Sequence, residues 1–136
     1  MDYGYAVVPF MAWLIAGISK FVINSVRAGQ LAFGQIGYGG LPSNHSAIVT
    51  SIAALIAIRQ GIDDPVFGVA VAVAFVVMLD AGSLRKQIGK HAEAINLLNM
   101  DSESQPLRER VGHSKQEIAA GIVVGILTAL LVDFVF

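Results

Sequence analysis

The stretch YAVVPFMAWLIAGISKFVINSV, residues 5–26, decides the fold class of this chain. An α-helix rises about 1.5 Å per residue, so roughly 20 mostly apolar residues are needed to cross the hydrocarbon layer of a membrane. This stretch is long enough by itself, and residues 118–136 form a second apolar run of comparable length. The sequence therefore predicts at least two membrane-spanning helices.

Two shorter apolar runs lie between them, at residues 46–58 and 65–79. Each falls short of a full span, so each needs flanking residues or a locally thinned bilayer to cross. With these residues included, we expect spans at about residues 5–26, 43–59, 65–82 and 115–136. The whole chain is 55% hydrophobic and only 14% charged, a composition typical of a polytopic membrane protein.

Residues 81–116 form the one extended polar region of the chain. Its first half repeats apolar side chains at helical spacing with basic residues on other faces, a pattern typical of an amphipathic helix in the plane of the membrane interface. The apolar positions are Leu84, Ile88, Ala92 and Ile95. We place this helix at about residues 84–100 and interpret the turn formers and charges after it as a loop.

The predicted fold is all-α: a polytopic membrane helix bundle with about four transmembrane helices and an interfacial amphipathic helix, in a single domain of residues 1–136. A cleavable signal peptide is disfavoured, because no basic region precedes the first apolar run and Lys20 and Arg27 follow its apolar part. The net charge of −1 argues against a nucleic-acid partner. Without cysteine, neither a disulfide nor a thiolate metal site is available.

Counting the spans brings the polar motifs to one side of the membrane. Lys20 and Arg27 end the first span, PSNHS begins the second, DAGSLRK ends the third and GHSKQE begins the fourth. Because four successive spans alternate in direction, all of these stretches reach the same face. The sequence thereby predicts a single active site at that face.

The residue types at that face suit an anion. Lys20 and Arg27 are two helical turns apart, so both project from one side of the first span. Ser43 or Asn44 can cap the second span, whose N-terminal N–H groups and helix dipole favour a negative charge. Arg85 adds a forked donor suited to phosphate oxygens.

Two histidines complete this cradle. His113 and Glu117 lie four residues apart near the start of the fourth span, so the carboxylate can hold one imidazole nitrogen and leave the other free to attack. His45 lies at the start of the second span. This combination suits phosphoryl transfer with one histidine as nucleophile and the other as acid.

These stretches resemble the phosphatidic acid phosphatase type 2 superfamily, and specifically its small divergent bacterial branch. The superfamily carries three motifs: Lys, six residues, Arg-Pro; then Pro-Ser-Gly-His; then Ser-Arg, five residues, His, three residues, Asp. The first is matched by Lys20 and Arg27, with Ala28 in place of the proline. The second is matched by PSNH at residues 42–45, with Asn44 in place of glycine.

The third motif is split in this chain. Ser83 and Arg85 lie at the end of the third span, whereas His113 begins the fourth and Glu117 stands where the superfamily has aspartate. Four basic residues compete for the arginine of this motif: Arg85, Lys86, Arg108 and Arg110. We prefer Arg85, because it is fixed to the end of a span. Asp80 and Ser83 are candidates for supporting this cationic cluster from behind.

The resemblance implies a membrane lipid-phosphate phosphatase that works through a phosphohistidine. His113 would attack phosphorus with Glu117 orienting it, and His45 would protonate the departing alkoxide and later activate water. Charge on the phosphoryl oxygens would be stabilised by Lys20, Arg27, Arg85 and the groups around Ser43 and Asn44. The implied substrates are phosphatidic acid, phosphatidylglycerophosphate or a prenyl phosphate or diphosphate, and neither a metal nor another cofactor is implied.

Two other classes of function stay open at this stage. The same cradle could bind or transport a lipid phosphate without turnover, and His45, His113 and Glu117 could instead ligate a metal. The middle spans are rich in Ala, Gly and Ser, which favours close helix packing among membrane lipids and a homo-oligomer, expected to be a dimer. We interpret His91 as an interfacial residue.

The distribution of basic residues predicts the orientation. The face with the polar motifs carries Lys20, Arg27, Arg85, Lys86, Lys90, Arg108, Arg110 and Lys115, whereas the other face has Arg59. The positive-inside rule then puts the active site on the cytoplasmic face of a bacterial inner membrane, with both termini outside. The bias persists when the three candidate site cations, Lys20, Arg27 and Arg85, are left out.

Overall fold

The computed structural model describes residues 3–33, 40–99 and 104–136, and these residues are helical wherever they have regular secondary structure. The α-helices are α1 (Gly4–Ala28), α2 (Asn44–Gln60), α3 (Pro65–Leu79), α4 (Arg85–Leu98) and α5 (Lys115–Val135). A single π-helical turn, η2 (Asp80–Leu84), joins α3 to α4. The all-α fold expected from the sequence is confirmed.

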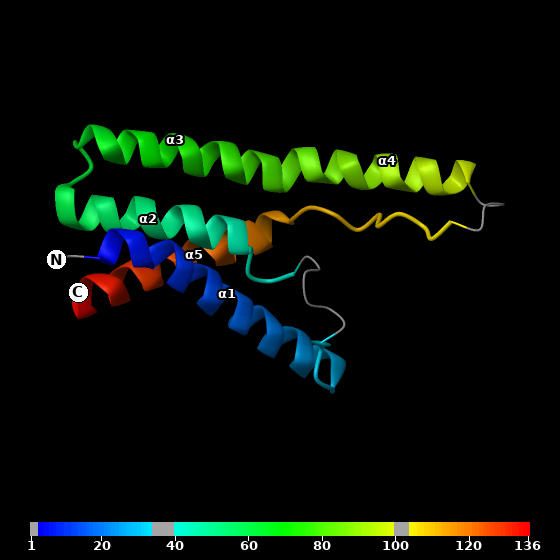
Figure 1. Cartoon of the computed structure of the whole chain (residues 1–136), viewed down its shortest axis with the longest axis horizontal. Helices are drawn as coiled ribbons and strands as arrows, with labels where there is room; N and C mark the ends of the chain where they lie inside the picture. The colour runs from blue at the N-terminus through cyan, green and yellow to red at the C-terminus, as the bar shows by residue number, and fades with distance from the viewer. Residues whose placement is uncertain (1–2, 34–39, 100–103) are drawn as a thin grey trace.

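Helix α2 is the centre of a bundle in which α1, α2, α3 and α5 lie side by side (Figure 1). It contacts all three of the other helices, and its buried residues include Leu55 and Ile56. Helix α3 packs against α2 on one side only, where Ala74 is buried, and it exposes most of its valines. Such a surface is suited to lipid, because lipid tails are as apolar as the side chains that meet them.

The protein is a helical membrane bundle. Within the described parts of the chain, three helical stretches are long and apolar enough to cross a membrane: Gly4–Ala28, Pro65–Leu98 and Lys115–Val135. Helix α2 is shorter, but it lies alongside them and buries Ser46, Thr50 and Ser51 among its neighbours, away from lipid. Both described ends of the chain lie at one end of the bundle, as an even number of crossings requires (Figure 1).

Two glycines of α5 allow it to pack tightly against α2. A Cβ added at Gly121 would collide with the carbonyl oxygen of Ser43 and come within 2.8 Å of the Cβ of Ser46. A Cβ at Gly125 would come within 2.7 Å of the carbonyl oxygen of Ala47. Small residues four apart let helix backbones approach closely in membranes. The start of α5 is therefore held directly against the start of α2.

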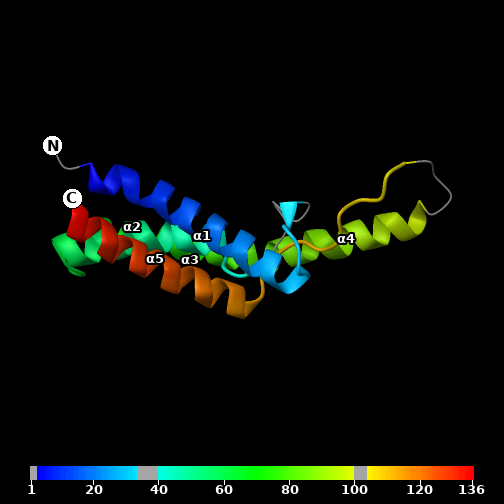
Figure 2. The same cartoon turned by 90° about the horizontal axis from the view of Figure 1, so that it is seen from below.

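Helices α3 and α4 form one continuous helix of 34 residues. At about 1.5 Å per residue it is roughly 50 Å long, far more than the ~30 Å hydrocarbon layer. The structure thus differs from the sequence prediction for residues 84–100: α4 continues the direction of α3 past the end of the bundle and does not turn aside into an interfacial plane (Figures 1 and 2). Within the π-turn the backbone hydrogen bonds span five residues, as in the bond from the N–H of Arg85 to the carbonyl oxygen of Asp80. The helix itself continues unbroken through this turn.

Polar contacts tie three helices together at the end of the bundle near the termini. Nε of Arg59 donates to Oδ1 of Asp133 at 2.7 Å, and Nε2 of Gln60 donates to the hydroxyl of Tyr5 at 2.9 Å. The guanidinium of Arg59 also lies over the ring of Tyr5, 5.5 Å from its centroid. These contacts link α1, α2 and α5 at the end opposite the polar motifs.

Candidate active site

A cavity of about 740 Å³ opens at the end of the bundle away from the termini. One wall is apolar and comes from α1, including Trp13, Leu14, Ile18 and Phe21. The start of α2, the start of α4 and the end of the extended segment before α5 contribute polar and basic residues: Asn44, His45, Arg85, Arg108 and His113. Together with Lys20 of α1, three basic side chains and two histidines therefore face one space with an apolar side.

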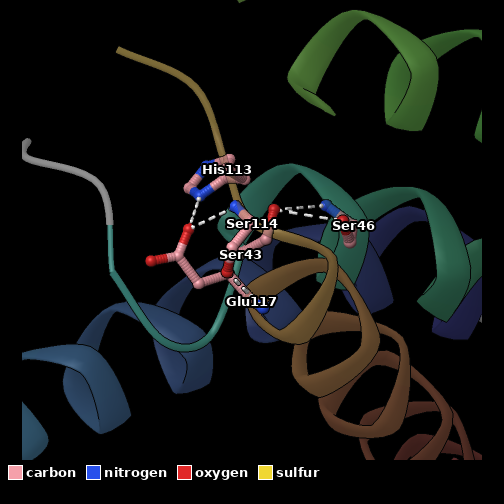
Figure 3. A network of polar contacts seen from close by, with 5 residues as sticks. All are labelled: Ser43, Ser46, His113, Ser114 and Glu117. Carbon is pink, nitrogen blue, oxygen red and sulfur yellow. Dashed lines mark hydrogen bonds and ion pairs between the residues drawn. The ribbon is translucent and has the colours of Figure 1, made fainter. Parts of the chain in front are cut away.

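His113 is held by the first turn of α5 (Figure 3). Its Nδ1 lies 3.0 Å from Oε2 of Glu117, and the same oxygen accepts the backbone N–H of Ser114 at 2.9 Å. The hydroxyl of Ser114 accepts the N–H of Glu117 at 3.2 Å, which completes a reciprocal helix cap. The cap therefore fixes the carboxylate that fixes the imidazole.

The backbone of His113 is anchored as well. Its N–H donates to the carbonyl oxygen of Ala81 at 2.9 Å, so the π-turn between α3 and α4 supports the segment that carries the histidine. The residue is 7% exposed and lines the cavity. With Nδ1 engaged by a carboxylate, the second ring nitrogen is left for chemistry in the cavity.

His45 lies close to His113 at this site. The centroids of the two imidazole rings are 5.9 Å apart and their planes are inclined by 59°. Nδ1 of His45 and Oδ1 of Asn44 are buried, and neither has a hydrogen-bond partner among the described residues. Buried polar atoms are normally paired, so these two atoms of adjacent residues are exceptions among the described residues.

The family is shown by comparison with known proteins. The model of the divergent PAP2 family matches residues 3–128 of the chain. The chain belongs to the divergent PAP2 family. It is 31% identical over 143 residues to membrane protein YuiD of Bacillus subtilis strain 168, described as uncharacterized, and the match covers 92% of this chain and 90% of that protein. No solved structure gives a significant match.

The two residues that match the first PAP2 motif, Lys20 and Arg27, differ in their position relative to the cavity. Lys20 lines the cavity, whereas Arg27 is exposed near the end of α1 and is not among its lining residues. The two positions share a helix face, but seven residues of helix separate them by about 10 Å along the axis. Asn24, between them, does line the cavity. Its position four residues after Lys20 in an apolar span was a usable signal, which the sequence analysis missed.

Asn44 and His45 of the second motif line the cavity, whereas Ser43 of the same motif makes hydrogen bonds within the protein. Ser43 is fully buried; its hydroxyl accepts the N–H of Ser46 at 3.3 Å and the Ser46 hydroxyl at 3.0 Å. Its own N–H donates to the carbonyl oxygen of Glu117 at 2.9 Å. The structure therefore places Ser43 in the cap of α2 and joins this motif to α5 (Figure 3).

The split third motif brings two arginines to the cavity. Arg85 lines it and forms an ion pair with Asp80, with Nε and Oδ2 3.1 Å apart. Arg108 lines it too, whereas Lys86 and Arg110 are not among its lining residues. The hydroxyl of Ser83 donates to the carbonyl oxygen of Leu79 at 2.6 Å on the exposed side of the helix.

The metal-site alternative has no geometric support. Within the described residues, no three His, Cys, Asp or Glu side chains are grouped so that they could hold a metal ion. His45, His113 and Glu117 do not make such a group, because Glu117 is directed at Nδ1 of His113 and the N–H of Ser114. The arrangement is that of an oriented imidazole facing a second imidazole.

Proposed function

We propose that this protein is a membrane lipid-phosphate phosphatase that forms a phosphohistidine at His113. The supporting observation is the cavity itself, because an apolar wall from α1 meets a group of cations and the His45–His113 pair in one space. A ligand that satisfies both parts is an amphiphile with a phosphate at its polar end. Membership of the divergent PAP2 family supports the same class of reaction.

In the first step, the free ring nitrogen of His113 attacks phosphorus. Glu117 accepts the Nδ1 proton of His113 in a hydrogen bond, which leaves the lone pair on Nε2 and stabilises the positive charge that develops on the ring. As the nitrogen–phosphorus bond forms, the bond from phosphorus to the lipid oxygen breaks. His45 gives its proton to that oxygen, so the lipid leaves as an alcohol.

In the second step, water attacks the phosphohistidine. His45, now neutral, takes a proton from the water as its oxygen bonds to phosphorus, and the nitrogen–phosphorus bond breaks to return His113. Inorganic phosphate leaves, and both histidines regain their starting protonation. The ring centroids are 5.9 Å apart, so one phosphoryl group bound beside the two rings is within reach of both.

The cations at the cavity stabilise the charge that develops on phosphoryl oxygens during both steps. Lys20 and Arg85 reach the site from α1 and from the start of α4. Asp80 holds Arg85 by its Nε, which leaves the other guanidinium nitrogens for the ligand. Preorganised charge of this kind is usually the largest contribution to catalysis.

We further propose that the site works on the cytoplasmic leaflet of a bacterial inner membrane. The cations of α4 and of the segment before α5 lie at the cavity end of the bundle, and Arg59 lies at the opposite end beside Asp133. This asymmetry is what the positive-inside rule requires for a cytoplasmic active site. The substrates would then be newly made lipid intermediates.

The test is phosphate release by the purified protein from phosphatidic acid, phosphatidylglycerophosphate, and prenyl phosphate and diphosphate. Wild type should release phosphate from at least one of them, and His113→Ala should lower kcat by roughly a thousandfold or more, because the nucleophile is lost. His91→Ala is the matched control, since His91 is exposed on α4 and does not line the cavity. Binding of these lipids without release by wild type would favour a non-catalytic lipid-phosphate binder instead.

A further inference from the structure

The segment before α5 contacts α4 at several points between Lys86 and Asn96. It runs back toward the bundle beside that helix, in the opposite direction (Figure 1). Four contacts follow in antiparallel order along α4 and the π-turn η2: Leu107 meets Asn96, Glu109 meets Gly89, Gly112 meets Lys86, and His113 meets Ala81 of η2. The part of α4 outside the bundle thus serves as a support for a stretch that ends at His113.

The two lengths agree with this description. The helix from Ala81 to Asn96 rises about 22 Å at ~1.5 Å per residue. Extended chain from Leu107 to His113 reaches about 20 Å at ~3.3 Å per residue. The segment therefore has little slack between its two attachments, and the position of each residue along it is set by α4.

Asn96 makes the attachment farthest from the bundle. Its Oδ1 accepts the N–H of Leu107 at 2.7 Å, and its Nδ2 donates to the carbonyl oxygen of Leu107 at 2.8 Å. Nδ2 also donates to Oε1 of Glu109 at 2.8 Å. One amide side chain therefore holds the residues immediately before and immediately after Arg108.

Gly89 and Gly112 let the segment lie directly against the helix. A Cβ added at Gly89 would collide with the carbonyl oxygen of Glu109. Gly112 has a φ of +96°, and a Cβ there would come within 3.1 Å of the backbone nitrogen of Lys86. Only glycine combines that backbone conformation with so little space.

Arg108 lies between the two residues that Asn96 holds and lines the cavity, and its Nε donates to the carbonyl oxygen of Arg110 at 3.3 Å. We propose that Arg108 is a phosphate ligand of the site and that Asn96, from the far end of α4, is the positioning residue that holds it there. The ligand chemistry is a phosphoryl group, which either a lipid headgroup or free phosphate supplies. The inference rests on the proposed function in taking the ligand of this cavity to be a phosphate.

The experiment measures binding of inorganic phosphate to the purified full-length protein by calorimetry, together with phosphate release from the preferred lipid. Arg108→Ala should weaken phosphate binding and raise KM for the lipid by about tenfold or more, since a charge-assisted hydrogen bond is lost. Arg110→Ala is the matched control, because Arg110 lies on the same segment, is exposed and does not line the cavity. It should bind phosphate as wild type does.

A double-mutant cycle tests the role of Asn96. Asn96→Ala should weaken phosphate binding severalfold in wild type and have no further effect in Arg108→Ala, because it acts through that arginine. Asn99→Ala, at the exposed end of the same helix, should change neither background. Equal losses from Asn96→Ala in both backgrounds would mean a general structural role and would overturn the positioning assignment.

The remaining outcomes separate this inference from the proposed function. Phosphate binding that depends on Arg108, in a protein that hydrolyses none of the lipids, would uphold Arg108 as a ligand and refute the phosphatase. Wild-type affinity in Arg108→Ala, or an equal loss in Arg110→Ala, would refute Arg108 as a ligand and leave the phosphatase intact. A wild type that neither binds phosphate nor releases it would refute both.

Discussion

A single carboxylate oxygen, Oε2 of Glu117, lies 3.0 Å from Nδ1 of His113 while it also accepts the N–H that begins α5. The same carboxylate oxygen therefore both orients the histidine and caps the helix. Aspartate, one methylene shorter, stands here in the wider superfamily that the sequence resembles. A glutamate at the third position of a helix can reach back to the cap and to the imidazole at once.

Glu117→Gln separates charge from geometry. Its amide oxygen can still accept from Ser114 and His113, but the negative charge that stabilises a charged imidazole is lost. We expect kcat to fall on the order of a hundredfold, less than in His113→Ala. Phosphate release under saturating lipid measures this. Ser114→Ala, which removes the cap hydroxyl and keeps the N–H contact, should lower stability by about 1 kcal/mol. A kcat for Glu117→Gln equal to that of wild type would show that the carboxylate has no catalytic role.

Gly121→Ala should destabilise the protein by about 1–3 kcal/mol, because the added methyl group forces α5 away from the start of α2. Thermal unfolding in mild detergent checks this. Gly68→Ala on α3 is the control, since a Cβ there has nothing within 4 Å. Its unfolding temperature should stay the same or rise slightly, as alanine is the better helix former. Equal unfolding temperatures for the two variants would contradict the close α2–α5 contact.

Gly17→Leu should discriminate between substrates by chain length. Gly17 lies on the apolar wall of the cavity, so a larger side chain there takes space that we assign to the lipid tail. The ratio of kcat/KM for a long-chain phosphate to that for a short-chain phosphate should fall roughly tenfold. Gly68→Leu, on the exposed surface of α3, is the control. An unchanged ratio in Gly17→Leu would place the tail elsewhere.

The orientation can be tested by labelling, because the chain has no cysteine of its own. Ser104 and Gln60 are both exposed. Gln60 ends α2 at the end of the bundle near the termini, whereas Ser104 belongs to the segment before α5, which extends beyond the other end (Figure 1). In intact bacteria, a cysteine at residue 104 should be shielded from a membrane-impermeant thiol reagent and one at residue 60 should react. The reverse pattern would move the active site to the outer leaflet.

Local sequence signals were sufficient for much of this fold. Apolar run length predicted α1 and α5, and the four-residue spacing of His113 and Glu117 predicted their contact, which forms because Glu117 reaches back from the first turn of α5 to the residue before the N-cap Ser114. The direction of α4 could not be read in this way. The amphipathic pattern specifies a helix and one apolar side, and only the unbroken join through η2 shows where that helix points.

Long-range contacts explain most of what the sequence left open at the site. Arg85 and Arg108 could not be distinguished by spacing, since the attachment of Leu107 to Asn96 joins segments with no common periodicity. Ser43 fits a phosphate motif and a helix cap equally well in sequence. The contact of its N–H with Glu117 depends on the glycine-lined packing of α5, which no local pattern contains.

The most direct test of the account is chemical trapping of the phosphohistidine. His45→Ala removes both the group that protonates the leaving oxygen and the group that activates water, so the trap uses a long-chain aryl phosphate, whose phenolate leaves without a proton. The covalent intermediate should then form and persist. This variant is mixed with the aryl ester carrying labelled phosphate, quenched in denaturant at alkaline pH and mapped by mass spectrometry. The label should be found on His113, with none on the His45→Ala, His113→Ala double variant. Turnover by wild type with no label at His113, or the same label in the double variant, would contradict it.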